Sequence, residues 1–152
     1  EQQALGVNAR ITELQAALGL SQLGRLDDMQ ARREALADRY DTLLAKLPLV
    51  LPPRRDDRRS AWHLYAVEID AARTPVRREA AFAALREAGI GVNVHYIPIH
   101  TQPYYQALGF KRGDFPAAEA YERQAISLPL FPQMTADEQD HVVEALAAAL
   151  GA

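Results

Sequence analysis

The residues W-H-L-Y-A-V-E-I, at positions 62–69, are the stretch of sequence that decides the fold. Aromatic and β-branched side chains of this kind are typical of a strand, because they pack well on a pleated surface. Successive side chains of a strand point to opposite faces. Trp62, Leu64 and Ala66, with Glu68 after them, therefore share one face. We expect this stretch to be one strand of a small sheet.

On the C-terminal side of this strand, turn and cap residues divide the chain into short elements. The expected elements, in order, are a helix from Thr74-Pro75 to Gly89, a strand over residues 91–97, a structured loop over 101–115, a short helix over 116–124, a strand over 126–130 and a last helix opened by the capping box of Thr135 and Glu138. Three short strands among helices predict an α+β fold, in which helices cover one side of the sheet.

On the N-terminal side, the apolar residues of positions 11–47 recur with the spacing of one helix face. The pattern predicts one long helix from Ile11 to about Lys46, which passes through Gly19 and Gly24. Thr12 and Gln15 resemble a capping box at its start, and the prolines at 48, 52 and 53 end it. We expect residues 1–47 to form an interface segment with a long connecting helix, and residues 48–152 to form a small domain.

The composition excludes several classes of function. The 152 residues contain no Cys, which removes disulfides and thiolate metal sites, and a net charge of -3 argues against a nucleic-acid partner. Neither a membrane span nor a signal peptide is expected, so we expect a cytoplasmic protein. Lys46 and Lys111 are the only lysines. A start at Glu1, without Met, indicates that the chain is cut from a longer one.

The densest group of polar residues is His95, Tyr96 and His100, which precede a loop that carries Tyr104 and Tyr105. One interpretation is a ligand pocket, and the other is a loop packed by its own aromatic residues. A metal site is disfavoured, because Pro98 separates the two histidines and no acidic residue accompanies them. No serine lies in a Gly-x-Ser-x-Gly elbow, which disfavours a serine nucleophile.

A second candidate site precedes the first helix, where Asn8 and Arg10 lie in the run G-V-N-A-R at residues 6–10. A guanidinium and the free N–H groups of a helix start suit an anion such as phosphate. The plainer interpretation is a turn before the helix with a solvated arginine. The residues by themselves leave both open.

Four motifs in this order resemble sugar aminotransferases of the DegT/DnrJ/StrS type. They are the run Gly6-x-Asn8-x-Arg10 continuing to residue 23, WHLY at 62–65, GIGVNVHYIPIH at 89–100 followed by PYY at 103–105, and SLPLFP at 127–132. The HYIPIH version is most similar to the transaminases that form UDP-4-amino-4,6-dideoxy-N-acetyl-altrosamine for pseudaminic acid synthesis.

The resemblance implies the small C-terminal domain of a fold type I enzyme that uses pyridoxal 5'-phosphate. The family works as a homodimer and transfers an amino group, with glutamate as donor, to a nucleotide sugar such as a UDP-4-keto-6-deoxy sugar. Carried over, Asn8 and Arg10 contact the cofactor phosphate of the neighbouring subunit. His95, Tyr96 and His100 line the sugar-nucleotide side of the pocket.

The resemblance also implies a large cofactor-binding domain upstream, which this chain lacks. The Schiff-base lysine of the family precedes the Gly-x-Asn-x-Arg run, and neither Lys46 nor Lys111 matches its place. We therefore expect no catalytic residue here, no covalently bound cofactor and no activity of the chain alone. Two alternatives stay open: a freestanding module that binds sugar nucleotides or dimerises, and a dehydratase of the same family, in which histidine replaces the lysine.

Overall fold

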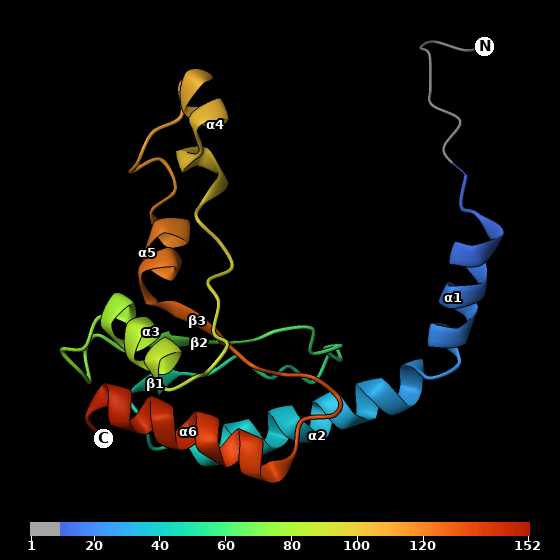
Figure 1. Cartoon of the computed structure of the whole chain (residues 1–152). Helices are drawn as coiled ribbons and strands as arrows, with labels where there is room; N and C mark the ends of the chain where they lie inside the picture. The colour runs from blue at the N-terminus through green and yellow to red at the C-terminus, as the bar shows by residue number, and fades with distance from the viewer. Residues whose placement is uncertain (1–9) are drawn as a thin grey trace.

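The structure is a computed structural model that describes residues 10–152 (Figure 1). Its elements, in chain order, are α1 (Glu13–Leu23), α2 (Leu26–Leu44), β1 (Leu49–Val50), β2 (Tyr65–Ile69), α3 (Arg78–Glu87), the 3-10 helix η1 (Ile99–Thr101), α4 (Pro103–Ala107), α5 (Pro116–Gln124), β3 (Ala125–Leu128) and α6 (Ala136–Leu150). The fold is the expected α+β arrangement, a small sheet packed against helices.

The sheet has three antiparallel strands in the order β1-β2-β3. Leu49 pairs with Ile69, and Tyr65 pairs with Leu128. Along β2 the residues Tyr65, Val67 and Ile69 are buried while those between them are half-buried. The expected alternation therefore holds within β2. Trp62 lies before the strand with a positive φ of 49° and is buried, so it does not continue that pattern.

The expected strand over residues 91–97 is wrong, and β1 takes its place as the third strand. Asn93 forms a single bridge with Ser127 and nothing further pairs. The Asn93 side chain accepts a hydrogen bond from the Val94 backbone N–H at 2.8 Å, which removes that N–H from any ladder. The chain therefore leaves the sheet edge directly after one bridge.

The core lies between the buried face of β2 and three helices, α2, α3 and α6. Tyr40, Tyr65, Leu85 and Leu146 are wholly buried there, and the rings of Tyr40 and Tyr65 lie 4.9 Å apart. Burying a large apolar side chain contributes about 1.5 to 3 kcal/mol. The Tyr40 hydroxyl donates to the Pro129 carbonyl at 3.0 Å, so its burial leaves no polar group unpaired.

The N-terminal helical region is two helices, and the expected single helix is wrong. The helical path ends at Gly24, and Arg25 has φ -112° and ψ 6°, outside the α region. Glycine costs about 1 kcal/mol in a helix interior, and α1 has no buried residue that could offset this cost. The capping box of Thr12 and Gln15 at the start of α1 is confirmed.

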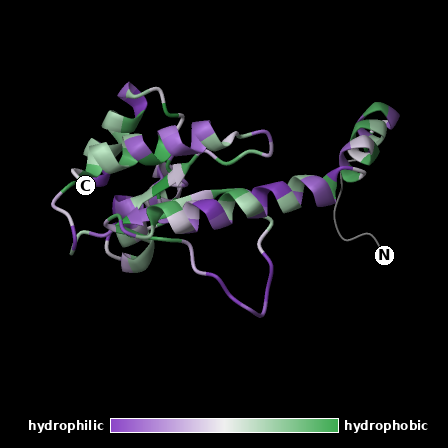
Figure 2. Cartoon of the chain, turned by 90° about the horizontal axis from the view of Figure 1, so that it is seen from below, coloured by the Kyte–Doolittle hydropathy of each residue, from purple (hydrophilic) through white to green (hydrophobic). Residues whose placement is uncertain are grey.

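The second half of α2 belongs to the core, because Leu36, Ala37, Tyr40 and Leu44 are buried. Arg32 and Arg33 donate to backbone carbonyls of the segment that precedes α6, so only α1 and the first turns of α2 extend away from the core, as an arm (Figure 1, Figure 2). A division of the chain near residue 47 stays a prediction.

Two helix starts were predicted with different success. Helix α3 begins at Arg78, after the N-cap Arg77, instead of at Pro75 after a Thr74 cap. The Thr74 hydroxyl accepts from the Val76 N–H at 3.2 Å and forms a turn of its own. Gly89, with φ 79°, ends the helical region as expected. The capping box of Thr135 and Glu138 opens α6 as predicted.

Candidate functional site

The predicted ligand residues lie in or beside a lobe formed by η1, α4 and α5, which rises from one end of the sheet (Figure 1). The segment that leads into the lobe starts at Asn93. Its backbone exchanges two hydrogen bonds with Ser127 of β3, at 3.2 Å and 2.8 Å. The edge of the sheet therefore fixes the position of the backbone directly before His95 and Tyr96.

His95 and Tyr96 are brought together at the base of this lobe. Nδ1 of His95 lies 2.8 Å from the Ser127 Oγ atom. The rings of His95 and Tyr96 meet edge to face, with centroids 4.6 Å apart, and the peptide bond between the two residues is cis. His95 is half-buried, while Tyr96 is 71% exposed. The pair can therefore present an imidazole and a phenol to a ligand at the surface.

His100 lies in a different environment from His95. Its side chain is buried, and Nε2 lies 2.9 Å from the Glu119 Oε1 atom. The same carboxylate oxygen accepts from the Gly113 backbone N–H at 2.6 Å. The Gly113 N–H, followed by His100, lowers the pKa of Glu119 below its ordinary value. Nε2 of His100 therefore takes part in the contact with Glu119 that joins parts of the lobe.

Glu119 is a site residue that the sequence analysis missed. It lies 19 residues after His100, in the first turn of α5, and no local pattern connects the two. Phe115 packs on the His100 ring with centroids 4.9 Å apart. A buried polar pair of this kind is visible only once the tertiary fold is known.

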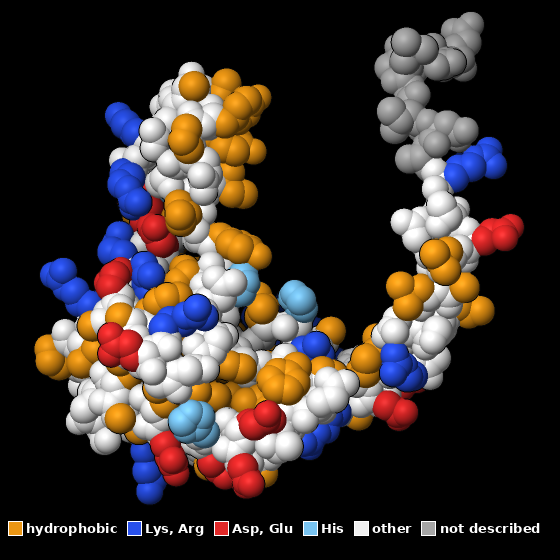
Figure 3. Space-filling model, viewed as in Figure 1, with side chains coloured by type: hydrophobic (Ala, Val, Ile, Leu, Met, Phe, Trp, Pro, Cys, Tyr) orange, Lys and Arg blue, Asp and Glu red, His pale blue; other side chains and the backbone are white. Residues whose placement is uncertain are grey.

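An apolar cavity of about 440 Å³ opens beside His100. Its lining residues are Pro98, Ile99, His100, Tyr105, Phe110, Phe115 and Ala118. Apolar side chains also gather on the side of the lobe that faces the N-terminal arm (Figure 3). The expected structured loop over 101–115 contains α4, and ring contacts join its residues Tyr105, Phe110 and Phe115.

The second candidate site, at the N-terminus, is only partly described. Asn8 lies outside the described residues. Arg10 is exposed in the segment before α1, and α1 lies on the opposite side of the molecule from the lobe (Figure 1). Within one copy of the chain, Arg10 and the pair of His95 and Tyr96 are therefore not brought together.

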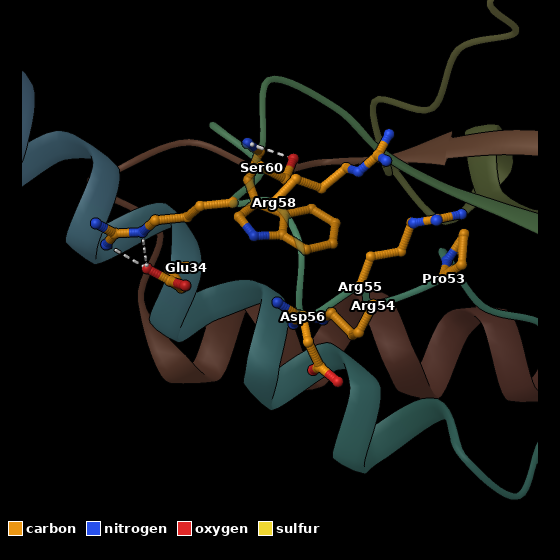
Figure 4. Close-up of a pocket in the computed structure, with 9 residues that line it drawn as sticks. Glu34, Pro53, Arg54, Arg55, Asp56, Arg58 and Ser60 are labelled. Carbon is orange, nitrogen blue, oxygen red and sulfur yellow. Dashed lines mark hydrogen bonds and ion pairs between the residues drawn. The ribbon is translucent and has the colours of Figure 1, made fainter.

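A further cavity, of about 390 Å³, lies beneath the arginine-rich loop that precedes β2 (Figure 4). The arginines that line this cavity are each paired with an acidic side chain. Arg59 pairs with Glu34, Arg58 pairs with Asp57, and Arg54 pairs with Asp38 and Asp41. The Arg54 guanidinium also lies 4.2 Å from the centroid of the Trp62 ring. No predicted site residue lines this cavity.

The described residues do not fit covalent attachment of pyridoxal phosphate. Lys46 and Lys111 are both exposed, whereas a Schiff-base lysine needs a desolvated pocket that lowers the pKa of its amine. Over residues 10–152, no group of three or more His, Cys, Asp or Glu side chains could hold a metal ion. In the same part of the chain, no helix is long and apolar enough to span a membrane.

Comparison with known proteins gives a consistent result. The model of the DegT/DnrJ/EryC1/StrS aminotransferase family matches residues 1–147. The spore coat polysaccharide biosynthesis protein SpsC of Bacillus subtilis is 47% identical over 149 residues, which are 96% of this chain and 38% of SpsC. The chain therefore spans well under half the length of this relative.

Two solved structures have the same fold over this region. DesV of S. venezuelae, in complex with a ketimine intermediate, has a TM-score of 0.86 at 34% identity, over 96% of this chain and 38% of DesV. PseC of Helicobacter pylori, an aminotransferase involved in the biosynthesis of pseudoaminic acid, has a TM-score of 0.84 at 27% identity, over 99% of this chain and 40% of PseC.

Proposed function

Because the chain belongs to the DegT/DnrJ/EryC1/StrS aminotransferase family, we propose that it serves as the small-domain part of a sugar aminotransferase dependent on pyridoxal phosphate. The observation that carries the proposal is the family match over residues 1–147, supported by 47% identity to SpsC. The amino donor is glutamate. The acceptor is a UDP-4-keto-6-deoxy sugar, as the similarity of HYIPIH to the pseudaminic acid transaminases suggests.

The sugar-nucleotide side of the pocket is assigned to His95, Tyr96 and His100. Their exposure supports these roles: Tyr96 is largely exposed, and His95 is half-buried beside it. His100 is buried against Glu119, so its role is to hold the lobe that carries the pocket, and the direct contacts fall to the other two. No step of amino transfer is assigned to residues 10–152, because neither lysine fits the cofactor.

Asn8 and Arg10 act on the cofactor phosphate of the neighbouring subunit in a homodimer. Within one copy the arm and the lobe stand apart, which supports this division of roles (Figure 1). The exposed leucines of the arm supply an apolar surface for association; they are Leu14, Leu18, Leu20 and Leu23. Each complete site then combines the arm of one subunit with groups of the other.

The test uses a full-length enzyme that carries residues 1–152 as its C-terminal part. His95→Ala is expected to raise the KM for the nucleotide sugar about fivefold or more, since a lost hydrogen bond costs about 1 kcal/mol, while the KM for glutamate stays unchanged. His141→Ala, at an exposed position of α6, is the matched control. Absence of amino transfer to any nucleotide 4-keto-sugar would contradict the proposal.

The second candidate function is a freestanding, non-catalytic module that binds sugar nucleotides. The apolar cavity of about 440 Å³ beside His100, which forms within this chain alone, favours it. Calorimetric titration of the 152-residue chain with UDP-N-acetylglucosamine distinguishes the two functions. Low-micromolar binding by the chain alone supports the module, whereas the aminotransferase proposal expects a site that is incomplete without the neighbouring subunit.

A further inference from the structure

Ser127 is the residue that holds the His95 segment on the sheet. It contributes three hydrogen bonds to residues 93–95: its N–H donates to the Asn93 carbonyl, its own carbonyl accepts from the Asn93 N–H, and its Oγ atom lies 2.8 Å from Nδ1 of His95. Ser127 is 5% exposed. A buried hydroxyl on a strand is fixed more firmly than one on a loop, so its partner ring is fixed as well.

The hydrogen bond between Ser127 and His95 can be formed in two ways. Either the Ser127 hydroxyl donates to Nδ1, or a proton on Nδ1 is donated to the hydroxyl oxygen. Among residues 10–152, Ser127 Oγ has no second partner. If Nδ1 carried the proton, the buried hydroxyl hydrogen would have no acceptor in this part of the chain. A buried donor without a partner is costly, so the first arrangement is favoured.

The favoured arrangement determines the chemistry of the other ring nitrogen. With Nδ1 as acceptor, a neutral His95 carries its proton on Nε2. Within the described residues, Nε2 has no hydrogen-bond partner, although the ring is half-buried. The N–H of Nε2 is therefore available to an oxygen of a bound molecule, next to the exposed ring of Tyr96.

We propose that Ser127 is a positioning residue that holds His95 in the tautomer with its proton on Nε2, so that this N–H donates to an acceptor oxygen of the nucleotide sugar. The inference rests on the proposed function for the identity of the ligand. A keto, hydroxyl or phosphate oxygen fits this donor, whereas an ammonium or another N–H does not. Ser127 itself does not touch the ligand.

The direct test is long-range proton–nitrogen NMR of the 152-residue chain labelled with ¹⁵N-histidine, at an alkaline pH at which the histidine signals no longer change with pH. Comparison with His95→Asn assigns the His95 signals. The native chain is expected to show His95 protonated on Nε2 with Nδ1 accepting a hydrogen bond. Protonation of Nδ1 in the native chain overturns the proposal without any variant of Ser127.

Two variants of Ser127 complete the test. Ser127→Ala removes the donor but keeps both backbone hydrogen bonds to Asn93, so His95 is expected to change to a mixture of tautomers. Ser127→Thr keeps a hydroxyl and is expected to restore the native tautomer. The signals of His63, His100 and His141 serve as the internal control for an intact fold. An unchanged His95 spectrum in folded Ser127→Ala overturns the proposal.

Kinetics of the full-length enzyme separate this inference from the proposed function. Ser127→Ala is expected to raise the KM for the nucleotide sugar about as much as His95→Ala, with no further rise in the double variant. Additive effects of the two changes would show that Ser127 acts on something other than His95 and would overturn the inference. If the tautomer responds to Ser127 but His95→Ala leaves the KM unchanged, the positioning holds and the proposed ligand role of His95 fails.

Discussion

Glu119 connects three parts of the lobe through one buried carboxylate. Glu119 belongs to α5, and its carboxylate contacts the His100 side chain of η1 and the Gly113 backbone N–H in the loop between α4 and α5. The lowered pKa means that the folded state favours the charged form. A carboxyl group whose folded pKa lies below its unfolded value stabilises the protein above the unfolded pKa, about 4.3 for Glu, and this contribution is lost as the pH falls through the folded value.

Glu119→Gln should therefore destabilise the chain near neutral pH and have a smaller effect once the pH falls below the lowered folded pKa of Glu119, because the native carboxyl is then protonated as well. Urea denaturation of the native chain and the variant at several pH values measures the difference in unfolding free energy. Glu144→Gln, at an exposed position of α6, is the control and should show little difference at any pH. Equal pH dependence of the two variants would contradict this account of Glu119.

For single residues, the sequence pattern identified the polar side chains of the candidate site but not the residues that they contact. His95, Tyr96 and His100 were selected because they lie close together in the chain. The structure divides them, since His95 contacts Ser127 and His100 contacts Glu119. Those partners lie 32 and 19 residues away. Contacts over such separations depend on the packing of α5 and β3, which no local pattern encodes.

Elements whose signal is local were predicted well. The capping boxes of α1 and α6 and the glycine stop at Gly89 depend on residues three or four positions apart. The strand at 91–97 and the single N-terminal helix failed for different reasons. After a single bridge to Ser127, the Asn93 side chain takes the Val94 N–H, and the chain leaves the sheet edge. A helical period does not keep a helix continuous through Gly24 when no buried residue stabilises it.

The two capping boxes give a matched comparison at the scale of elements. Thr135→Ala should lower the unfolding free energy by about 1 kcal/mol, because α6 contributes Val142, Leu146 and Leu150 to the core. Thr12→Ala removes an equivalent cap from α1, which has no buried residue. It should leave global unfolding unchanged and affect only local hydrogen exchange in α1.

Chemical denaturation followed by far-UV circular dichroism, together with hydrogen exchange of α1 amides, measures both effects. If Thr12→Ala lowered global stability as much as Thr135→Ala, then α1 would be part of the cooperative core of this chain. The division into an arm and a core would then be wrong.

At the scale of the whole molecule, the arm and the lobe extend from the same core on opposite sides (Figure 1, Figure 3). The arm carries exposed leucines and Arg10, and the lobe carries exposed aromatic residues with the pair of His95 and Tyr96. Neither set meets the other within one copy. This geometry supports the central claim, that the arm of one subunit completes the active site of its neighbour.

The most direct test of that claim is complementation in the full-length enzyme. Arg10→Ala should lower kcat/KM about tenfold or more, because a charge-assisted hydrogen bond to phosphate contributes about 1.5 to 3 kcal/mol. A second variant lacks the Schiff-base lysine of the large domain and is inactive. Mixed dimers of the two variants contain one site with both groups present, so the account predicts partial recovery of activity. Mixed dimers that form without any recovery would show that Arg10 does not act across the interface and would contradict the account.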